Sequence, residues 1–109
     1  MRQALVIAHR GASGYRPEHS ASAYRLALRL GADGVETDVV ASRDGVLVCR
    51  HDVTLSRTTD VAGRPEFRKL RRTLDIGGRS LTDWFVHDFT WAQLATLKCR
   101  ERWPRKRSV

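Results

Sequence analysis

The sequence predicts a mixed α/β fold, because strand-like and helix-like segments alternate along its first half. Leu5–Ala8 is a short continuous apolar run bounded by polar residues, which is typical of a strand buried on both faces. Apolar side chains then recur at helical spacing over 21–30, and apolar and polar residues alternate over 34–40. A chain of 109 residues has room for one domain of this class and little more.

The first helix is expected over residues 21–30. Ser20 has the side chain of an N-cap residue, and Gly31 can end the helix in a left-handed conformation. Ala23 and Ala27 are four positions apart and therefore lie on one apolar face. This helix follows the glycine-containing loop at 9–14, so the first strand delivers polar groups to a loop before the chain turns into the helix.

A β-hairpin is expected after the strand at 34–40. Asp44-Gly45 is a turn signal, and the β pattern resumes at 46–49. If these two residues form a two-residue loop, Asp38 lies directly opposite His51, with Cβ atoms roughly 5 Å apart. A longer loop with a bulge would shift this register. The two-residue loop therefore predicts that both groups share one face of the hairpin.

The second half of the chain is divided by its pattern into three segments. Residues 61–89 have glycines, a proline and scattered charges, and indicate an irregular insertion. Thr90 and Gln93 resemble a capping box, which predicts a helix from about 91 to 99 within the segment 90–100. Residues 101–109 form a basic tail. Apolar side chains that could anchor the insertion are Phe67, Leu70, Leu74 and Ile76.

Composition excludes several classes of protein. Hydrophobic residues make up 41% and charged residues 29%, which fits neither a disordered nor a membrane-embedded chain. Cys49 and Cys99 match no disulfide framework and no zinc motif. The apolar run near the N-terminus is too short for a signal peptide, which predicts a cytoplasmic chain as written, or a secreted or periplasmic one if a start lies upstream.

The net charge of +8 would attract phosphates of any kind, nucleic acid included. Most of this excess lies in residues 98–109, where six basic residues face a single glutamate. No nucleic-acid recognition motif accompanies the charge, so no nucleic-acid partner is expected. Association through unpaired strand edges is expected instead.

Polar residues of matching chemistry collect at the ends of the predicted strands. Glu36 and Asp38 lie on one face of a strand, where two carboxylates are costly to bury unless a cation or donor compensates. A solvated strand face is the alternative. Carboxylate oxygens suit Mg²⁺ or Ca²⁺ better than zinc. His9 and His51 could then act as general acid and base, with Arg10 holding an anionic oxygen, which suggests hydrolysis or transfer at a phosphate ester.

The order and spacing of these motifs resemble the N-terminal part of a glycerophosphodiester phosphodiesterase. The resemblance is specific from about Val6 to Asp60 and looser through residues 83–94. The motifs that carry it are His9-Arg10-Gly11-Ala12, Pro17-Glu18, Gly31-Ala32-Asp33-Gly34-Val35-Glu36-Thr37-Asp38, Asp44-Gly45, His51-Asp52 and Arg57-Thr58-Thr59.

This resemblance implies a TIM barrel of the phospholipase-C-like phosphodiesterase type, of which 1–60 would supply the first strands and helix. It implies a lipid-metabolic hydrolase that splits glycerophosphodiesters into glycerol 3-phosphate and an alcohol. His9 and His51 would be the catalytic acid/base pair, Arg10 would contact the substrate phosphate, and Glu36 and Asp38 would bind a divalent cation, Ca²⁺ or Mg²⁺.

The chain also departs from the family pattern. A TIM barrel needs about 250 residues, so more than half of the barrel has no counterpart here. The family's further metal-binding glutamate and nearby lysine are unmatched, since Glu66 and Glu101 lie outside any matching motif. His19 stands where many relatives have asparagine, and we expect it to be structural.

Two alternatives remain open. One is a noncatalytic, truncated remnant or binding module that holds a cation or a glycerophosphoryl group, alone or as a strand-exchanged oligomer. The other is a phosphodiesterase of the same superfold with a different head-group preference. Divalent-cation affinity and solution size test the first, and substrate choice tests the second.

Overall fold

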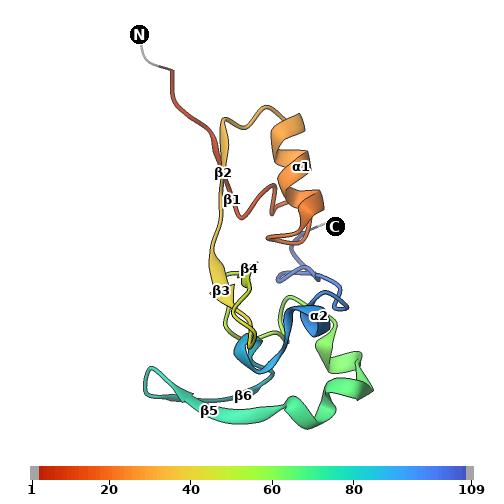
Figure 1. Cartoon of the computed structure of the whole chain (residues 1–109). Helices are drawn as coiled ribbons and strands as arrows, with labels where there is room; N and C mark the ends of the chain where they lie inside the picture. The colour runs from red at the N-terminus through yellow and green to blue at the C-terminus, as the bar shows by residue number, and fades with distance from the viewer. Residues whose placement is uncertain (1–2, 108–109) are drawn as a thin grey trace.

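The computed structural model describes residues 3–107 as an elongated α/β chain (Figure 1). Its radius of gyration is 15.4 Å and its extents are 55 × 28 × 26 Å, whereas a compact domain of this length has a radius of about 13 Å. The strands form three separate two-stranded sheets. The predicted α/β class is therefore confirmed, and the described residues contain no closed barrel.

One end of the molecule is a parallel β-α-β unit. Strand β1 (Ile7–His9) leads through a loop into helix α1 (Ala21–Arg29), which returns the chain to strand β2 (Gly34–Glu36). The two strands pair in parallel, with His9 level with Glu36. Ser20 caps α1 by accepting a hydrogen bond from the Ala23 amide, as the sequence predicts.

The loop after β1 packs tightly against α1 at Gly11. Gly11 has a φ of +84°, and a Cβ at this position would lie 2.8 Å from the backbone carbon of Ala23. Only glycine combines that left-handed conformation with such a close approach. Gly11 therefore brings the beginning of α1 close to the end of β1.

The β1 strand is exposed, contrary to the expectation of burial on both faces. Leu5, Val6 and Ile7 are 74%, 60% and 54% exposed. In the described chain β1 pairs only with β2, and α1 covers one side of this pair. Burial on both faces requires further strands and a second layer, and residues 3–107 supply neither.

The predicted strand at 34–40 is divided into β2 and β3 (Val39–Ala41), and β3 forms the predicted hairpin with β4 (Leu47–Cys49). The predicted register is wrong by one residue. The loop contains three residues closed by a bond from the Ser42 amide to the Val46 carbonyl (2.8 Å), with Gly45 at a φ of +81°. Such loops place glycine in the left-handed region before the second strand.

This register places Arg50, not His51, opposite Asp38. The Arg50 amide donates to the Asp38 carbonyl over 2.9 Å. Because side chains alternate along a strand, a shift of one residue turns each side chain to the other face. His51 consequently lies in a bend after β4.

The insertion at 61–89 is more regular than its sequence pattern suggests. It contains two short 3₁₀ segments, Val61–Gly63 and Pro65–Leu70, followed by the antiparallel strands β5 (Arg72–Ile76) and β6 (Arg79–Asp83). A third 3₁₀ turn spans Val86–Asp88. The β5–β6 turn is Gly77-Gly78, both at positive φ, which is the glycine pair that a tight hairpin turn favours.

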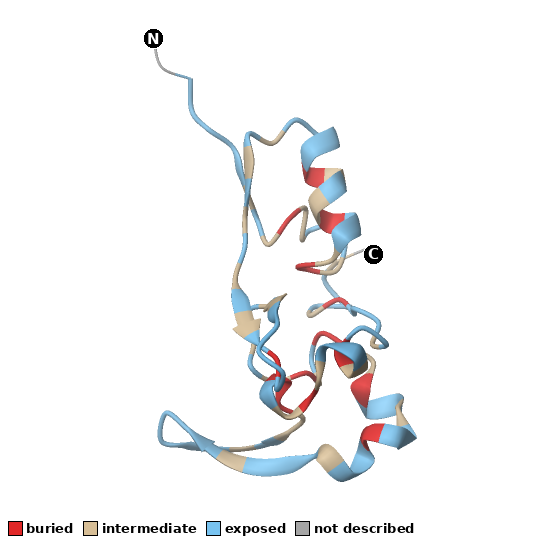
Figure 2. Cartoon of the chain, viewed as in Figure 1, coloured by how far each residue is buried: buried red, intermediate tan, exposed pale blue. Residues whose placement is uncertain are grey.

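The hydrophobic core lies in this half of the molecule, as Figure 2 shows. Phe67 is buried as predicted and packs edge-on against Phe89, with ring centroids 5.0 Å apart. Leu70 packs against the core from its edge, whereas Ile76 is 38% exposed on the hairpin and is not an anchor. The buried members are Leu55, Val61, Phe67, Val86, Phe89 and Leu94.

The last helix is shorter than expected. The capping box of Thr90 and Gln93 is present, but α2 spans only Trp91–Leu94 instead of continuing to residue 99. The amide of Lys98 donates to Asp60 Oδ1, and Cys99 forms a β-bridge with Thr59. These contacts with residues 59–60 occupy the backbone groups of Lys98 and Cys99, which would form hydrogen bonds within the helix if α2 continued to residue 99. None of the described helices has the length and apolarity to span a membrane.

Candidate active site

The carboxyl ends of β1 and β2 bring together the residues that the sequence predicts as functional. Because the strands are parallel and in register, His9 and Glu36 lie side by side, with His9 Nε2 3.8 Å from Glu36 Oε2. The His9 side chain is 69% exposed and that of Glu36 37%. Both groups are therefore accessible to a ligand at this edge.

Arg10 is held at the centre of the cluster. It has a φ of +61°, and its amide donates to both the carbonyl and the carboxylate of Glu36, each over 3.1 Å. Its Nη1 donates to Glu18 over 3.1 Å, and its Nε lies 4.0 Å from Asp38 Oδ2. Within residues 3–107 that Nε has no hydrogen-bond partner. The guanidinium thus keeps donor capacity beside two carboxylates.

Asp38 forms a hydrogen bond with His19, whose buried side chain fits the structural role that we expect for it. His19 is 3% exposed at its side chain, and its Nε2 donates to Asp38 Oδ2 over 3.0 Å. Its Nδ1 forms a hydrogen bond with the Tyr24 hydroxyl. Burial raises the pKa of Asp38, but the hydrogen bond and charge of His19 and the charge of His51 outweigh it and lower the pKa below its ordinary value. Asp38 is therefore an ionised carboxylate at neutral pH.

His51 reaches the same region from a different element. It is near enough to Asp38 for its charge to affect that carboxylate, although the two do not pair across the hairpin. Its Nδ1 makes a 2.7 Å hydrogen bond with Asp52 Oδ1, and its side chain is 48% exposed. Its Nε2 is consequently the ring nitrogen left for proton transfer.

A charge network beneath the cluster was not predicted from sequence. Arg102, in the predicted basic tail, donates to both oxygens of Glu18 (3.0 and 2.8 Å) and to Asp52 Oδ2 (2.7 Å). These bonds outweigh the effect of burial, and they raise the pKa of Arg102 above its ordinary value. Arg107 also donates to the Ser13 carbonyl. The segment therefore packs beneath the site, which no local pattern in its sequence indicates.

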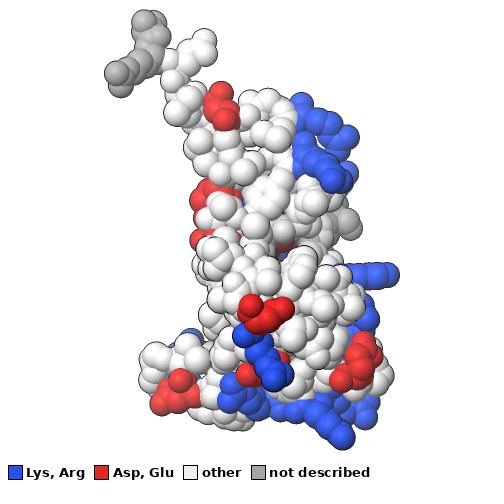
Figure 3. All heavy atoms as spheres, in the orientation of Figure 1, with Lys and Arg blue, Asp and Glu red and all other residues white. Residues whose placement is uncertain are grey.

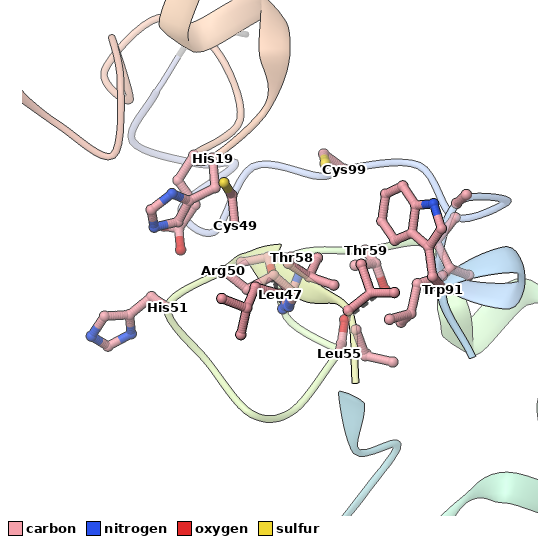
Figure 4. A pocket seen from close by; sticks show the side chains of 16 residues that line it. His19, Leu47, Cys49, Arg50, His51, Leu55, Thr58, Thr59, Trp91 and Cys99 are labelled. Atoms are coloured by element: carbon pink, nitrogen blue, oxygen red, sulfur yellow. Dashed lines mark hydrogen bonds between the residues drawn. The ribbon is translucent and has the colours of Figure 1, made fainter. Parts of the chain in front are cut away.

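A cavity of about 380 Å³ lies beside the site. Its lining is mainly apolar and comes from β4, α2 and the segment leading to Cys99, with His19 and His51 at one end (Figure 4). His9, Arg10 and Glu36 do not line it. The cavity thus adjoins the predicted acid/base histidine at 51 without including the rest of the cluster.

The described chain supplies only part of a ligand set for the predicted divalent cation. Within residues 3–107, no three His, Cys, Asp or Glu side chains are grouped so as to hold a metal ion. Glu36 and Asp38 offer the carboxylate oxygens that Mg²⁺ and Ca²⁺ prefer, but these cations take six or more oxygen ligands. The two carboxylates therefore fit as part of a ligand set.

Acid should weaken this network in a defined direction. Burial raises the pKa of Glu18, but hydrogen bonds and charges from Arg102 and Arg10 outweigh it and hold the pKa below its ordinary value of 4.5. A depressed folded-state pKa contributes stability that is complete above pH 4.5 and is lost as the pH falls through the folded value. Glu18→Gln should therefore cost about 3 kcal/mol at pH 7, because it removes the buried negative charge that Arg102 and Arg10 both contact.

Urea unfolding of wild type and Glu18→Gln from pH 7 to pH 3 tests this expectation. The difference in unfolding free energy should be largest near neutrality and should shrink below pH 4.5. A difference that stayed constant across this range would show that the ionised carboxylate is not the stabilising form.

On the face in Figure 3, acidic side chains lie along the edge near β2 and Lys and Arg lie over α1, whereas side chains of both signs are mixed at the opposite end. The candidate site combines a carboxylate pair, whose oxygens are the kind that hard cations prefer, with an arginine and two histidines, whose donors are the kind that phosphate oxygens accept from.

Comparison with known proteins identifies the family. Residues 9–108 match the glycerophosphoryl diester phosphodiesterase family. The chain therefore belongs to that family. It is 48% identical over 98 residues to glycerophosphodiester phosphodiesterase GDPD6 of Arabidopsis thaliana, covering 90% of this chain and 26% of the relative. It is 64% identical over 59 residues to a probable glycerophosphodiester phosphodiesterase 1 of Mycobacterium tuberculosis, covering 54% and 22%.

Solved structures agree with the sequence comparison. A glycerophosphodiester phosphodiesterase from Agrobacterium tumefaciens superposes with a TM-score of 0.68 at 30% identity, covering 97% of this chain and 37% of that one. An Oleispira antarctica phosphodiesterase, solved with the product sn-glycerol-3-phosphate, gives 0.66 at 31%, covering 95% and 34%. The chain spans about a quarter of the length of the curated relatives it matches.

Proposed function

We propose that this chain carries the N-terminal part of the active site of a hydrolase that cleaves glycerophosphodiesters to glycerol 3-phosphate and an alcohol, in lipid and glycerol metabolism. The observation that carries the proposal is the parallel register that sets His9 beside Glu36, with Arg10 bound to that same glutamate. The Oleispira relative's complex with sn-glycerol-3-phosphate supports this class of small-molecule substrate.

The two predicted histidines divide the proton transfers. One deprotonates the attacking oxygen, which is a water or the substrate's own glycerol hydroxyl, and the other protonates the alkoxide that leaves phosphorus. Attack by the glycerol hydroxyl gives a cyclic phosphate, which a water then opens to glycerol 3-phosphate. His51 can exchange its proton at Nε2, because Nδ1 is bound to Asp52. His9 is exposed at the strand end beside Glu36. Arg10 would hold a non-bridging phosphate oxygen with the donor capacity of its guanidinium.

The divalent cation, Ca²⁺ or Mg²⁺, is a proposal that rests on the chemistry of two side chains. Glu36 and Asp38 would hold the ion, which when bound would neutralise charge on phosphate oxygens. The hydrogen bond from His19 orients the Asp38 carboxylate and lowers its pKa, so that the group stays ionised. The remaining ligands would come from water, substrate or residues outside this chain.

We also propose that the chain corresponds to the first part of a TIM barrel. Strand β1, helix α1 and strand β2 form the β-α-β unit from which such barrels are built. The exposed apolar side chains of β1 support this arrangement, because further strands would bury them. The region 61–89 would be an insertion that carries its own core.

A second candidate is a noncatalytic binding module. It is favoured by the presence of only two carboxylates in the proposed ligand set and by the unpaired edges of β1 and β4. Such edges promote association of copies. The module would bind a cation or a glycerophosphoryl group without turning over substrate.

Release of glycerol 3-phosphate from glycerophosphocholine by the purified chain, with Mg²⁺ or Ca²⁺, tests the proposal. His51→Ala should lower the rate by at least about 100-fold, the usual contribution of a general acid or base. His87→Ala is the matched control, because His87 is an exposed histidine near β5, away from the site. Equal rates for wild type and His51→Ala would contradict the assignment.

Two further measurements separate the alternatives. Cleavage of phosphatidylinositol but not glycerophosphocholine would favour a related phosphodiesterase with another head-group preference. Cation binding without turnover would favour the binding module, and light scattering would show whether that module self-associates.

A further inference from the structure

We propose that Arg102 is a positioning residue that fixes His51 and Arg10 relative to each other, acting through Asp52 and Glu18. This inference rests on the proposed function, because His51 and Arg10 are the proposed acid/base and phosphate-binding groups. Arg102 lies in the segment after α2, about fifty residues from His51 in sequence and more than eighty from Glu18.

The first branch of the network leads to the acid/base histidine. Arg102 Nη2 donates to Asp52 Oδ2 over 2.7 Å, and the other oxygen, Oδ1, is 2.7 Å from His51 Nδ1. The Asp52 carboxylate is thus held at both oxygens. An ionised carboxylate can only accept, so the Nδ1 of His51 must carry the proton of that bond.

This bond determines the tautomer of His51. When the neutral ring keeps its proton at Nδ1, the lone pair is at Nε2, which is the nitrogen available for proton transfer. Burial raises the pKa of Asp52, but the hydrogen bonds from His51 and Arg102 outweigh it and lower that pKa. Asp52 therefore stays ionised while His51 exchanges its proton.

The second branch leads to the proposed phosphate-binding arginine. Arg102 donates from Nε to Glu18 Oε2 over 3.0 Å and from Nη2 to Glu18 Oε1 over 2.8 Å. The same Oε1 accepts from Arg10 Nη1 over 3.1 Å. One guanidinium thus connects the loop after β1 with the bend after β4.

Burial distinguishes this network from an ordinary surface ion pair. The side chains of Arg102, Glu18 and Asp52 are 11%, 6% and 16% exposed. Surface pairs contribute little, because solvent screens them and side-chain entropy opposes them. Arginine presents its donors in a rigid planar fork, so a lysine at position 102 could not bind both carboxylates in the same geometry.

The tautomer of His51 in the 109-residue chain provides a test that does not depend on turnover. It is read from the ¹⁵N shifts of Nδ1 and Nε2 at a pH where the ring is neutral. In Arg102→Gln we expect the Nδ1–H fraction to fall at least about twofold, because Asp52 loses the donor that orients it. Asp52→Ala should give a similar fall, since it removes the acceptor itself.

Arg105→Gln is the matched control. It removes the same charge from the same C-terminal segment, but from an exposed side chain that makes no hydrogen bond or ion pair within residues 3–107. This variant should keep the wild-type tautomer. If Arg102→Gln does not fold, Arg102→Lys is the variant to measure, because it keeps the positive charge but lacks the planar guanidinium. A folded Arg102→Lys should also show a smaller Nδ1–H fraction at His51.

Turnover provides the second readout. If the wild-type chain releases glycerol 3-phosphate, Arg102→Gln should lower kcat by about 10- to 100-fold, the usual effect of losing a residue that orients a site residue. A folded Arg102 variant with the wild-type tautomer would overturn the inference. A wild-type chain without turnover would instead count against activity of the isolated chain, and the tautomer measurement would still decide the role of Arg102.

Discussion

Phe89→Ala is expected to destabilise the chain by about 3 to 5 kcal/mol, the cost of truncating a fully buried aromatic side chain. Phe89 has no exposed surface and packs edge-on against Phe67 in the main hydrophobic cluster. Folded domains have only about 5 to 15 kcal/mol of net stability. The substitution should therefore unfold a large part of the population at 25 °C, as measured by circular dichroism in urea.

Tyr15→Ala provides the control for this experiment. Tyr15 is also aromatic, but its side chain is 60% exposed in the loop after β1. Its removal should change the unfolding free energy by no more than about 0.5 kcal/mol. Similar losses in the two variants would show that the cluster around Phe89 is not the main source of stability.

The second large effect is expected at the carboxylate pair. Replacing Glu36 by glutamine together with Asp38 by asparagine should weaken Mn²⁺ binding at least about tenfold, because the neutral amides lack the negative charge that attracts the ion. Mn²⁺ is a suitable probe, since its paramagnetism broadens nearby NMR signals. The signal of His9, which lies 3.8 Å from Glu36, should broaden in wild type and recover in the double variant.

Asp75→Asn is the matched control, because Asp75 is an exposed carboxylate on β5, outside the site. It should leave the broadening of His9 unchanged. Broadening that persisted in the double variant would place the cation elsewhere and would contradict the proposed ligand role of Glu36 and Asp38.

The two predictions test separate parts of the molecule. The site residues gathered at β1 and β2 are positioned by local elements, whereas the apolar face of β1 has no cover in the described chain. The hydrophobic core and the candidate site therefore lie in different halves of the molecule. Phe89→Ala tests the half with the core, and the Glu36 and Asp38 variants test the half with the site.

The sequence by itself determined the local elements and the chemistry of the candidate site. Ser20 predicted the start of α1, and Thr90 with Gln93 predicted the capping box of α2, because caps depend only on residues three or four apart. The parallel pairing that sets His9 beside Glu36 follows from the strand, helix and strand order of one β-α-β unit.

Only the tertiary structure decided the register of the hairpin, the length of α2 and the position of Arg102. A two-residue and a three-residue loop are both compatible with Asp44-Gly45, and their difference exchanges the faces of the following strand. The end of α2 depends on bonds from Lys98 to Asp60, far away in sequence. Arg102 falls in the predicted basic tail, and the two carboxylates that bind it lie 50 and 84 positions earlier. Long-range pairing of this kind leaves no local pattern, because its partners meet only when the chain is folded.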